Sequence, residues 1–128
     1  MKRILIFWFL ILPLTTFSQN GATILKKDLV GIWRIDETKV NGLIISDNDP
    51  SQQDEIILRE DNTHTRTDKS FNYEESGPWR LIDNKFIELT DSKKNQKKLF
   101  EIISIQGRIL KIRIMYDNTT IDMTLSKN

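Results

Sequence analysis

The sequence predicts an all-β fold in which an antiparallel meander closes into an eight-stranded barrel. Two Gly-x-Trp units, Gly31-Ile32-Trp33 and Gly77-Pro78-Trp79, each open a run in which apolar and polar residues alternate. Such alternation is typical of strands with one buried face, whose large rings fill an interior. Further short alternating runs follow with two-residue turns between them, which leaves no room for the helical crossovers that a parallel sheet needs.

The first 19 residues have the layout of a secretory signal peptide. Basic residues stand near the start, an apolar run covers Ile4–Leu14, and the small residue Ser18 follows. We expect cleavage after Ser18 or Gln19. A membrane-spanning helix needs about 20 apolar residues, so this run is too short to span; an uncleaved membrane anchor is the alternative reading. We therefore expect an exported protein, periplasmic or secreted, whose β-barrel domain covers residues 20–128.

The composition limits what this domain can do. The chain has no cysteine, which excludes disulfides and the acylated cysteine of a lipoprotein, so we expect no integral membrane anchor and a domain held together by its apolar interior. Removing Lys2 and Arg3 with the leader leaves 17 basic against 18 acidic residues, a net charge of −1. That balance gives no electrostatic basis for binding nucleic acid or an acidic membrane surface. We expect a monomer without a cofactor.

The expected elements follow the alternation along the chain. Asn20–Lys27 is a lead-in, with one helical turn over Ile24–Leu29. Nine strand-like runs then follow, and they come to eight strands if the third and fourth runs are one bent strand. They are Gly31–Lys39, Asp54–Glu60, Thr63–Thr67, Lys69–Tyr73, Pro78–Ile82, Lys85–Thr90, Lys97–Ile105, and Arg108–Tyr116 followed by Thr119–Ser126.

The connections favour tight hairpins. Turn-forming pairs separate the runs at Asp61-Asn62, Asp83-Asn84, Gln106-Gly107 and Asp117-Asn118. The connection over Val40–Gln53 is long and polar. Consecutive strands are therefore expected to be antiparallel neighbours.

One apolar face runs across the whole predicted sheet. A meander with one apolar face must hide it, and closure into a barrel also removes exposed edges; a two-sheet sandwich is the alternative. The residues expected on this face are Trp33, Ile35, Ile56, Leu58, Phe71, Tyr73, Trp79, Leu81, Ile87, Leu89, Phe100, Ile102, Leu110, Ile112, Ile114, Tyr116, Ile121, Met123 and Leu125.

With this pattern the chain resembles the bacterial lipocalin-like domains. The resemblance rests on Leu29-Val30-Gly31-Ile32-Trp33-Arg34 and Gly77-Pro78-Trp79-Arg80-Leu81 and extends over Lys26–Lys127. It implies an exported barrel that binds a small ligand. It assigns no binding residue, because no Thr-Asp-Tyr-type second motif is found. The stretch Val40–Gln53 is also too short and polar for the helix pair of the related fatty-acid-binding barrels.

The polar candidates favour neither an enzyme nor a metal site. His64 is the single histidine, without acidic or thiol partners at metal-ligand spacing, and we expect it on the surface. Glu74-Glu75 reads as a hairpin tip. The lysines between two strands indicate a solvated hairpin, with an anion-docking point as the alternative: Lys93, Lys94, Lys97 and Lys98. No nucleophile–base pair is evident, so we expect a non-enzymatic protein.

The apolar face leaves two hypotheses for function. Either the interior is a filled core, or it holds a pocket for a small hydrophobic molecule. The residues expected to line such a pocket are Trp33, Phe71, Tyr73, Trp79, Phe100, Ile112, Ile114, Tyr116 and Met123. The second hypothesis is a protein-binding module or inhibitor of the cell envelope, which acts through its loops or through the lead Gln19–Lys27.

Overall fold

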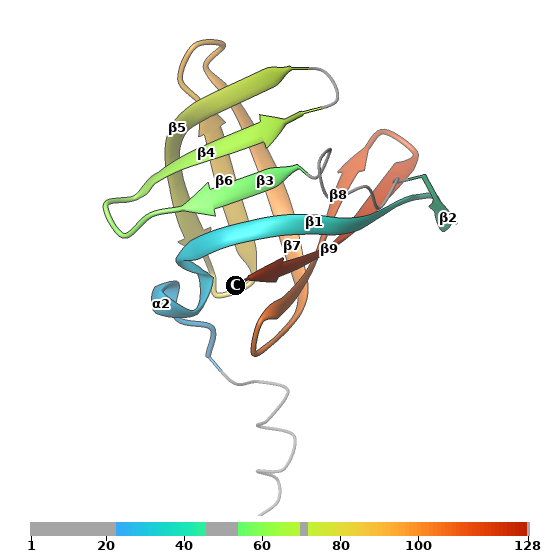
Figure 1. The fold of residues 1–128 in the computed structure, drawn as a ribbon, viewed down its shortest axis with the longest axis horizontal. Helices are drawn as coiled ribbons and strands as arrows, with labels where there is room; N and C mark the ends of the chain where they lie inside the picture. The colour runs from blue at the N-terminus through green and yellow to red at the C-terminus, as the bar shows by residue number, and fades with distance from the viewer. Residues whose placement is uncertain (1–22, 46–53, 70–71, 128) are drawn as a thin grey trace, which may run out of the picture.

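The computed structural model describes residues 23–45, 54–69 and 72–127, and it confirms the predicted fold class. An antiparallel meander closes into an eight-stranded barrel, and a two-residue ninth strand, β2, is added beside it (Figure 1). Among these residues no helix is long and apolar enough to cross a membrane. The elements are α2 (Lys26–Leu29), β1 (Gly31–Val40), β2 (Leu43–Ile44), β3 (Glu55–Leu58), β4 (Thr63–Asp68), β5 (Tyr73–Ile82), β6 (Phe86–Asp91), β7 (Gln96–Gln106), β8 (Ile109–Tyr116) and β9 (Thr119–Lys127).

Strand β1 closes the barrel because it is paired on both edges. Along one edge it pairs with β9, from Trp33↔Lys127 to Val40↔Ile121. Along the other edge its first half pairs with β3 and its last two residues pair with β2. The seam between the first and last strands is therefore hydrogen-bonded, which encloses the inner face of the sheet.

Two predictions about strand boundaries were wrong. Lys69 and Asn72 belong to the turn between β4 and β5, and Asn72 has φ 51°. Strand β5 then begins at Tyr73 rather than Pro78, because the polar residues from Tyr73 onward pair fully with β4. Strand β2 was not expected. The rest of the predicted Val40–Gln53 connection, from residue 46 onward, lies outside the described residues.

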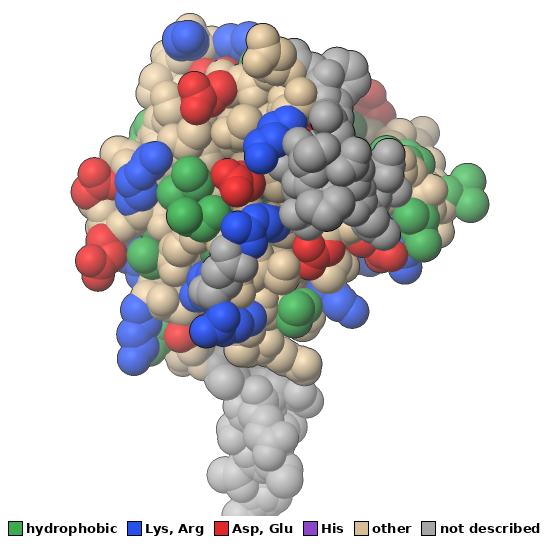
Figure 2. All heavy atoms as spheres, viewed as in Figure 1, with side chains coloured by type: hydrophobic (Ala, Val, Ile, Leu, Met, Phe, Trp, Pro, Cys, Tyr) green, Lys and Arg blue, Asp and Glu red, His purple; other side chains and the backbone are tan. Residues whose placement is uncertain are grey.

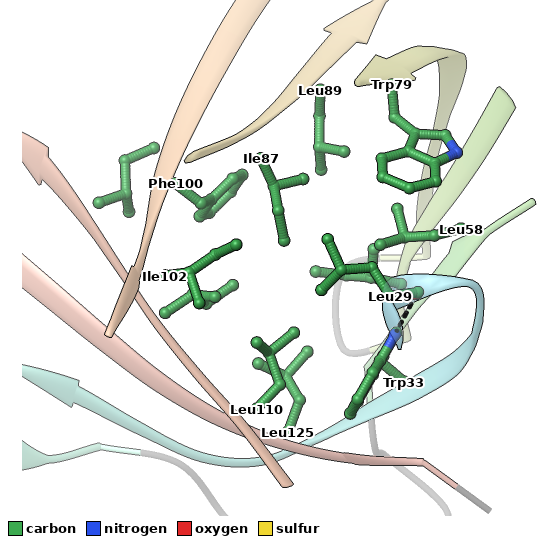
Figure 3. Packing of buried hydrophobic residues seen from close by; sticks show 13 residues of the cluster. Leu29, Trp33, Leu58, Trp79, Ile87, Leu89, Phe100, Ile102, Leu110 and Leu125 are labelled. Atoms are coloured by element: carbon green, nitrogen blue, oxygen red, sulfur yellow. Dashed lines mark hydrogen bonds between the residues drawn. The ribbon is translucent and has the colours of Figure 1, made fainter. Parts of the chain in front are cut away.

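The two tryptophans of the Gly-x-Trp units are buried, as predicted, and each holds a connection at the same end of the barrel. The indole N–H of Trp33 donates to the carbonyl of Leu29 at 2.7 Å (Figure 3). The indole N–H of Trp79 donates to the carbonyl of Arg59 at 2.8 Å, in the β3–β4 turn. The ammonium group of Lys127 makes a cation–π contact, since it lies 4.8 Å from the centre of the Trp33 ring. Each buried ring thus combines apolar burial with a satisfied polar group.

The core consists of inward-facing aliphatic and aromatic side chains (Figure 3). Its buried members are Leu29, Trp33, Ile56, Leu58, Trp79, Ile87, Leu89, Phe100, Ile102, Leu110, Ile112, Ile114 and Leu125. All of these except Leu29 were predicted from the alternation. Tyr116 was placed on the buried face wrongly: it is exposed, because β8 extends past the rest of the barrel there. Phe71 lies outside the described residues.

Gly77 is needed for the close approach of β5 to the end of β6. A Cβ at this position would overlap the carbonyl oxygen of Thr90 and lie 2.8 Å from Oγ of Ser92. We expect Gly77→Ala to lower the free energy of unfolding by about 1–3 kcal/mol, as overpacking does in well-packed proteins. Urea denaturation measures the change. The exposed neighbour Ser76 gives the control, since Ser76→Ala should change stability by less than about 0.5 kcal/mol. Equal stability of the two variants would contradict the packing account.

Candidate functional site

The barrel has a closed end and an open end. Since neighbouring strands are antiparallel, helix α2 lies at the same end as the β3–β4, β5–β6 and β7–β8 turns. Leu29 of α2 is fully buried there and closes the barrel. The opposite end carries the connections after β1, β4, β6 and β8, and we call it the open end (Figure 1).

The apolar part of the interior is filled. Among the described residues, the enclosed space between the core side chains is about 10 Å³, and Trp33, Phe100 and Ile112 are among those that border it. A space of this size holds at most one water molecule, whereas ligand pockets measure roughly 300–1,000 Å³. A hydrophobic ligand in the barrel would therefore have to displace core side chains.

The residues predicted to line a pocket are not gathered around one. Trp33, Phe100 and Ile112 border the small enclosed space, and Trp79 and Ile114 belong to the same packed core. The others are elsewhere. Met123 is partly buried against the core, Tyr73 and Tyr116 lie at the open end, and Phe71 lies outside the described residues.

A buried group of charged side chains lies on the inner wall toward the open end. His64 of β4, expected on the surface, is 0% exposed, and Glu75 of β5, expected at a hairpin tip, is also buried. Nδ1 of His64 lies 3.0 Å from the carbonyl oxygen of Gly77, and its Nε2 lies 3.2 Å from a carboxylate oxygen of Glu75. Both partner atoms are acceptors, and the ring lies between two oxygen atoms of β5.

Glu75 is the centre of this cluster. Its second carboxylate oxygen accepts hydrogen bonds from Arg66 at 3.2 Å, Lys98 at 3.1 Å and the Tyr73 hydroxyl at 3.4 Å. Burial by itself raises the pKa of Glu75, but Arg66, Lys98 and His64 outweigh it and lower the pKa to about 2. The predicted solvated lysine hairpin was therefore wrong for Lys98, which points inward and pairs with Glu75.

The cluster is a connected network of charged and polar side chains. Both ring nitrogens of His64 lie within hydrogen-bond distance of oxygen atoms of β5. Among the described residues, no three His, Asp or Glu side chains lie close enough together to share a metal ion. Tyr73 links the cluster to a second buried carboxylate, Asp91, at 3.4 Å.

A signal for this cluster was present in the sequence. Glu75, Gly77 and Trp79 share one face of a continuous strand by their spacing of two, and Trp79 was already assigned to the interior. The register Arg66↔Glu75 and His64↔Gly77 then brings the polar residues of β4 onto the same face. The prediction that this strand begins at Pro78 divided the shared face and placed Glu75 in a turn.

The chain is similar in fold to the crystal structure at 2.60 Å resolution of an uncharacterized protein from Bacteroides eggerthii DSM 20697. The TM-score is 0.50 with 16% sequence identity, and the match covers 77% of this chain and 98% of that chain. At this identity the likeness extends to the fold alone. No family model and no curated protein matches the chain.

The lowered pKa of Glu75 predicts how stability depends on pH. A carboxyl group with pKa about 2 in the folded state and about 4.5 when unfolded stabilises the fold above pH 4.5 and loses that effect as the pH falls toward 2. We expect Glu75→Gln to lower the free energy of unfolding by about 3 kcal/mol at pH 7, and the difference from the parent to shrink between pH 5 and pH 2. Urea titrations across this range measure it. Exposed Glu74 provides the control, because Glu74→Gln should leave the pH profile unchanged.

Proposed function

We propose that this chain is an exported, non-enzymatic, lipocalin-like protein that binds a partner protein of the cell envelope through the open end of its barrel. The filled interior carries the proposal. With about 10 Å³ between the core side chains, the space in which this fold would store a hydrophobic molecule is occupied by the protein itself. Recognition is therefore assigned to the outer surface.

The open end bears an apolar surface suited to this role. We call it the apolar tip: Leu43, Ile44, Ile45, Met115 and Tyr116. These residues lie on the ends of β2 and β8 and on the residue after β2, and hydrophobic side chains project from the edge near β2 in Figure 2. Exposed apolar groups gathered at one place are typical of protein interaction sites.

The tip continues the apolar face of the core into solvent. Ile114, Ile121, Val40 and Leu43 are paired across β8, β9, β1 and β2, so their side chains share the inner face. Ile114 is 7% exposed, whereas Leu43 at the other end of this row is 73% exposed. A partner that covers Leu43 would extend the core, and the hydrophobic effect would favour this contact by about 25 cal/mol per Å² of apolar area buried.

Strand β2 also offers hydrogen bonds. It pairs with β1 on one edge, and no described strand pairs with its other edge. Exposed strand edges bind extended segments of other proteins by adding a strand. Main-chain pairing would then orient the partner while the side chains of Leu43 and Ile45 supply apolar contact.

Export is supported by the signal-like first 19 residues. We expect the chain recovered from the medium or periplasm to begin at Gln19 or Asn20, since cleavage is expected after Ser18 or Gln19. Intact-mass spectrometry of the recovered protein measures the first residue. A chain that is recovered only with the membrane fraction and retains Met1–Leu14 would contradict export as a free protein.

Site-specific crosslinking in living cells tests partner binding. A photoreactive amino acid at Ile44 or Met115 should give the same discrete adduct with another protein, because both side chains lie on the apolar tip. The double substitution Leu43→Asp and Ile45→Asp should abolish it, since charges there oppose apolar contact. Glu60, in the exposed β3–β4 turn at the closed end, is the control position and should give no adduct.

The competing role in ligand storage has its own measurement. Fatty acids or hydrophobic dyes that enter the barrel would change the fluorescence of buried Trp33 and Trp79. A saturable change, together with the same crosslinking pattern from Glu60 as from the tip, would overturn the proposal.

A further inference from the structure

We propose that the closed end of the barrel carries a second interaction site, in which an extended, acidic peptide segment of a partner adds to the free edge of β7. This site lies at the opposite end from the apolar tip, and it goes beyond the partner binding proposed there. Three features support this site: strand β7 extends beyond β6, a hollow lies beside the extension, and charged side chains line that hollow.

Strand β7 is longer than β6 and leaves part of one edge unpaired by any described strand. The two strands pair from Asp91↔Gln96 to Phe86↔Glu101, and the last bond on this side runs from the N–H of Ile102 to the carbonyl of Lys85. Beyond it, Ser104, Ile105 and Gln106 pair with β8 on one edge, and no described strand pairs with the other edge of residues 103–106. That edge is therefore available for pairing.

An irregularity in β7 helps to separate it from β6. The pairing with β8 shifts between Ile102 and Ser104, so that Ile103 is an extra residue in the strand. Such a bulge bends its strand and increases the local twist. In Figure 1 the β7–β8 hairpin extends past the β5–β6 turn at the closed end.

A hollow of about 940 Å³ lies along this edge. One wall is formed by Thr23, Ile24 and the start of α2, and the other by the β5–β6 turn at residues 83–85. The edge of β7 lines this hollow together with both segments, and a hollow of this volume has room for an extended chain beside the edge. Four paired residues span about 13 Å at the rise of a β-strand.

The lining of the hollow indicates the chemistry of the peptide. Ile24 and Ile105 pack partly against the core and Ile103 is exposed, which provides apolar contact for alternate side chains. Three lysines and two aspartates complete the charged lining: Lys27, Lys85, Lys127, Asp28 and Asp83.

The balance of these charges favours an acidic segment. One of the two carboxylates is already engaged, since Asp28 accepts the N–H of Leu25 at 3.0 Å. Lys27 and Lys85 are exposed beside the hollow, and Lys85 also pairs with Glu101 at 3.7 Å. Acidic side chains of a bound peptide would meet these ammonium groups and steer its approach.

Selection from a random octapeptide display library against the purified exported protein tests the site. Enriched peptides should alternate apolar and polar residues, include Asp or Glu, and shift the backbone amide NMR signals of Ser104, Ile105 and Gln106. Peptides that shift the signals of the apolar tip instead, or no enrichment over a bare support, would overturn the proposal. Neither result bears on crosslinking from Ile44 or Met115, so the two proposals fail separately.

Variants of the lining give the matched comparison. A lysine on an exposed strand edge opposes pairing, so Ile103→Lys should weaken the binding of a selected peptide at least about tenfold in fluorescence anisotropy. Lys27→Glu combined with Lys85→Glu should weaken it about tenfold at low salt and less at high salt. Lys97→Glu, on exposed Lys97 at the other end of β7, should bind as the parent does. If Ile103→Lys lowers the melting temperature, the charge-reversal pair and the NMR mapping decide, and equal affinity of that pair and the parent would overturn the site.

Discussion

The pairing of β1 with β9 is the constraint on which the rest of this structure depends. It closes the sheet, so the inward side chains within the closed part of the barrel are removed from water and have to be packed or paired. Apolar residues satisfy this requirement over most of the barrel, from Leu29 at the closed end to Ile114 near the open end. At the inner wall of β4 and β5 the requirement is met by polar contacts instead, where the carboxylate of Glu75 is surrounded by Arg66, Lys98 and the ring of His64.

Apolar packing and buried ion pairs are distributed differently between the two ends of the barrel. The closed end is fixed by short hydrogen bonds from the Trp33 and Trp79 indoles to main-chain carbonyls, which tie α2 and the β3–β4 turn to the core. The open end has the buried ion pairs inside and the apolar tip outside. A buried ion pair adds little net stability over apolar packing, but removal of one partner is strongly destabilising. The cluster therefore specifies the register of β4 against β5 more than it strengthens the core.

The filled interior is the reason that recognition is proposed for the surface of the barrel. An eight-stranded barrel is wide enough to hold one small ligand, yet large side chains such as Trp33, Phe100 and Leu110 meet across this one. Two strand edges are left unpaired by any described strand: the outer edge of β2 and the edge of residues 103–106 in β7. Both edges are bordered by apolar side chains.

The sequence by itself determined the fold class, the meander order and almost the whole core. The spacing of two that relates Trp33 to Ile35, or Ile112 to Ile114, is a local property that states which side chains share a face, and the turn pairs fix which strands are neighbours. Tertiary structure decided the rest. Glu75 and His64 are polar, and their burial follows from a register with β4 and from cations on β7, which are distant in sequence and cannot be read from local alternation. The volume left inside depends in the same way on how side chains from all eight strands meet, which closure of the barrel alone determines.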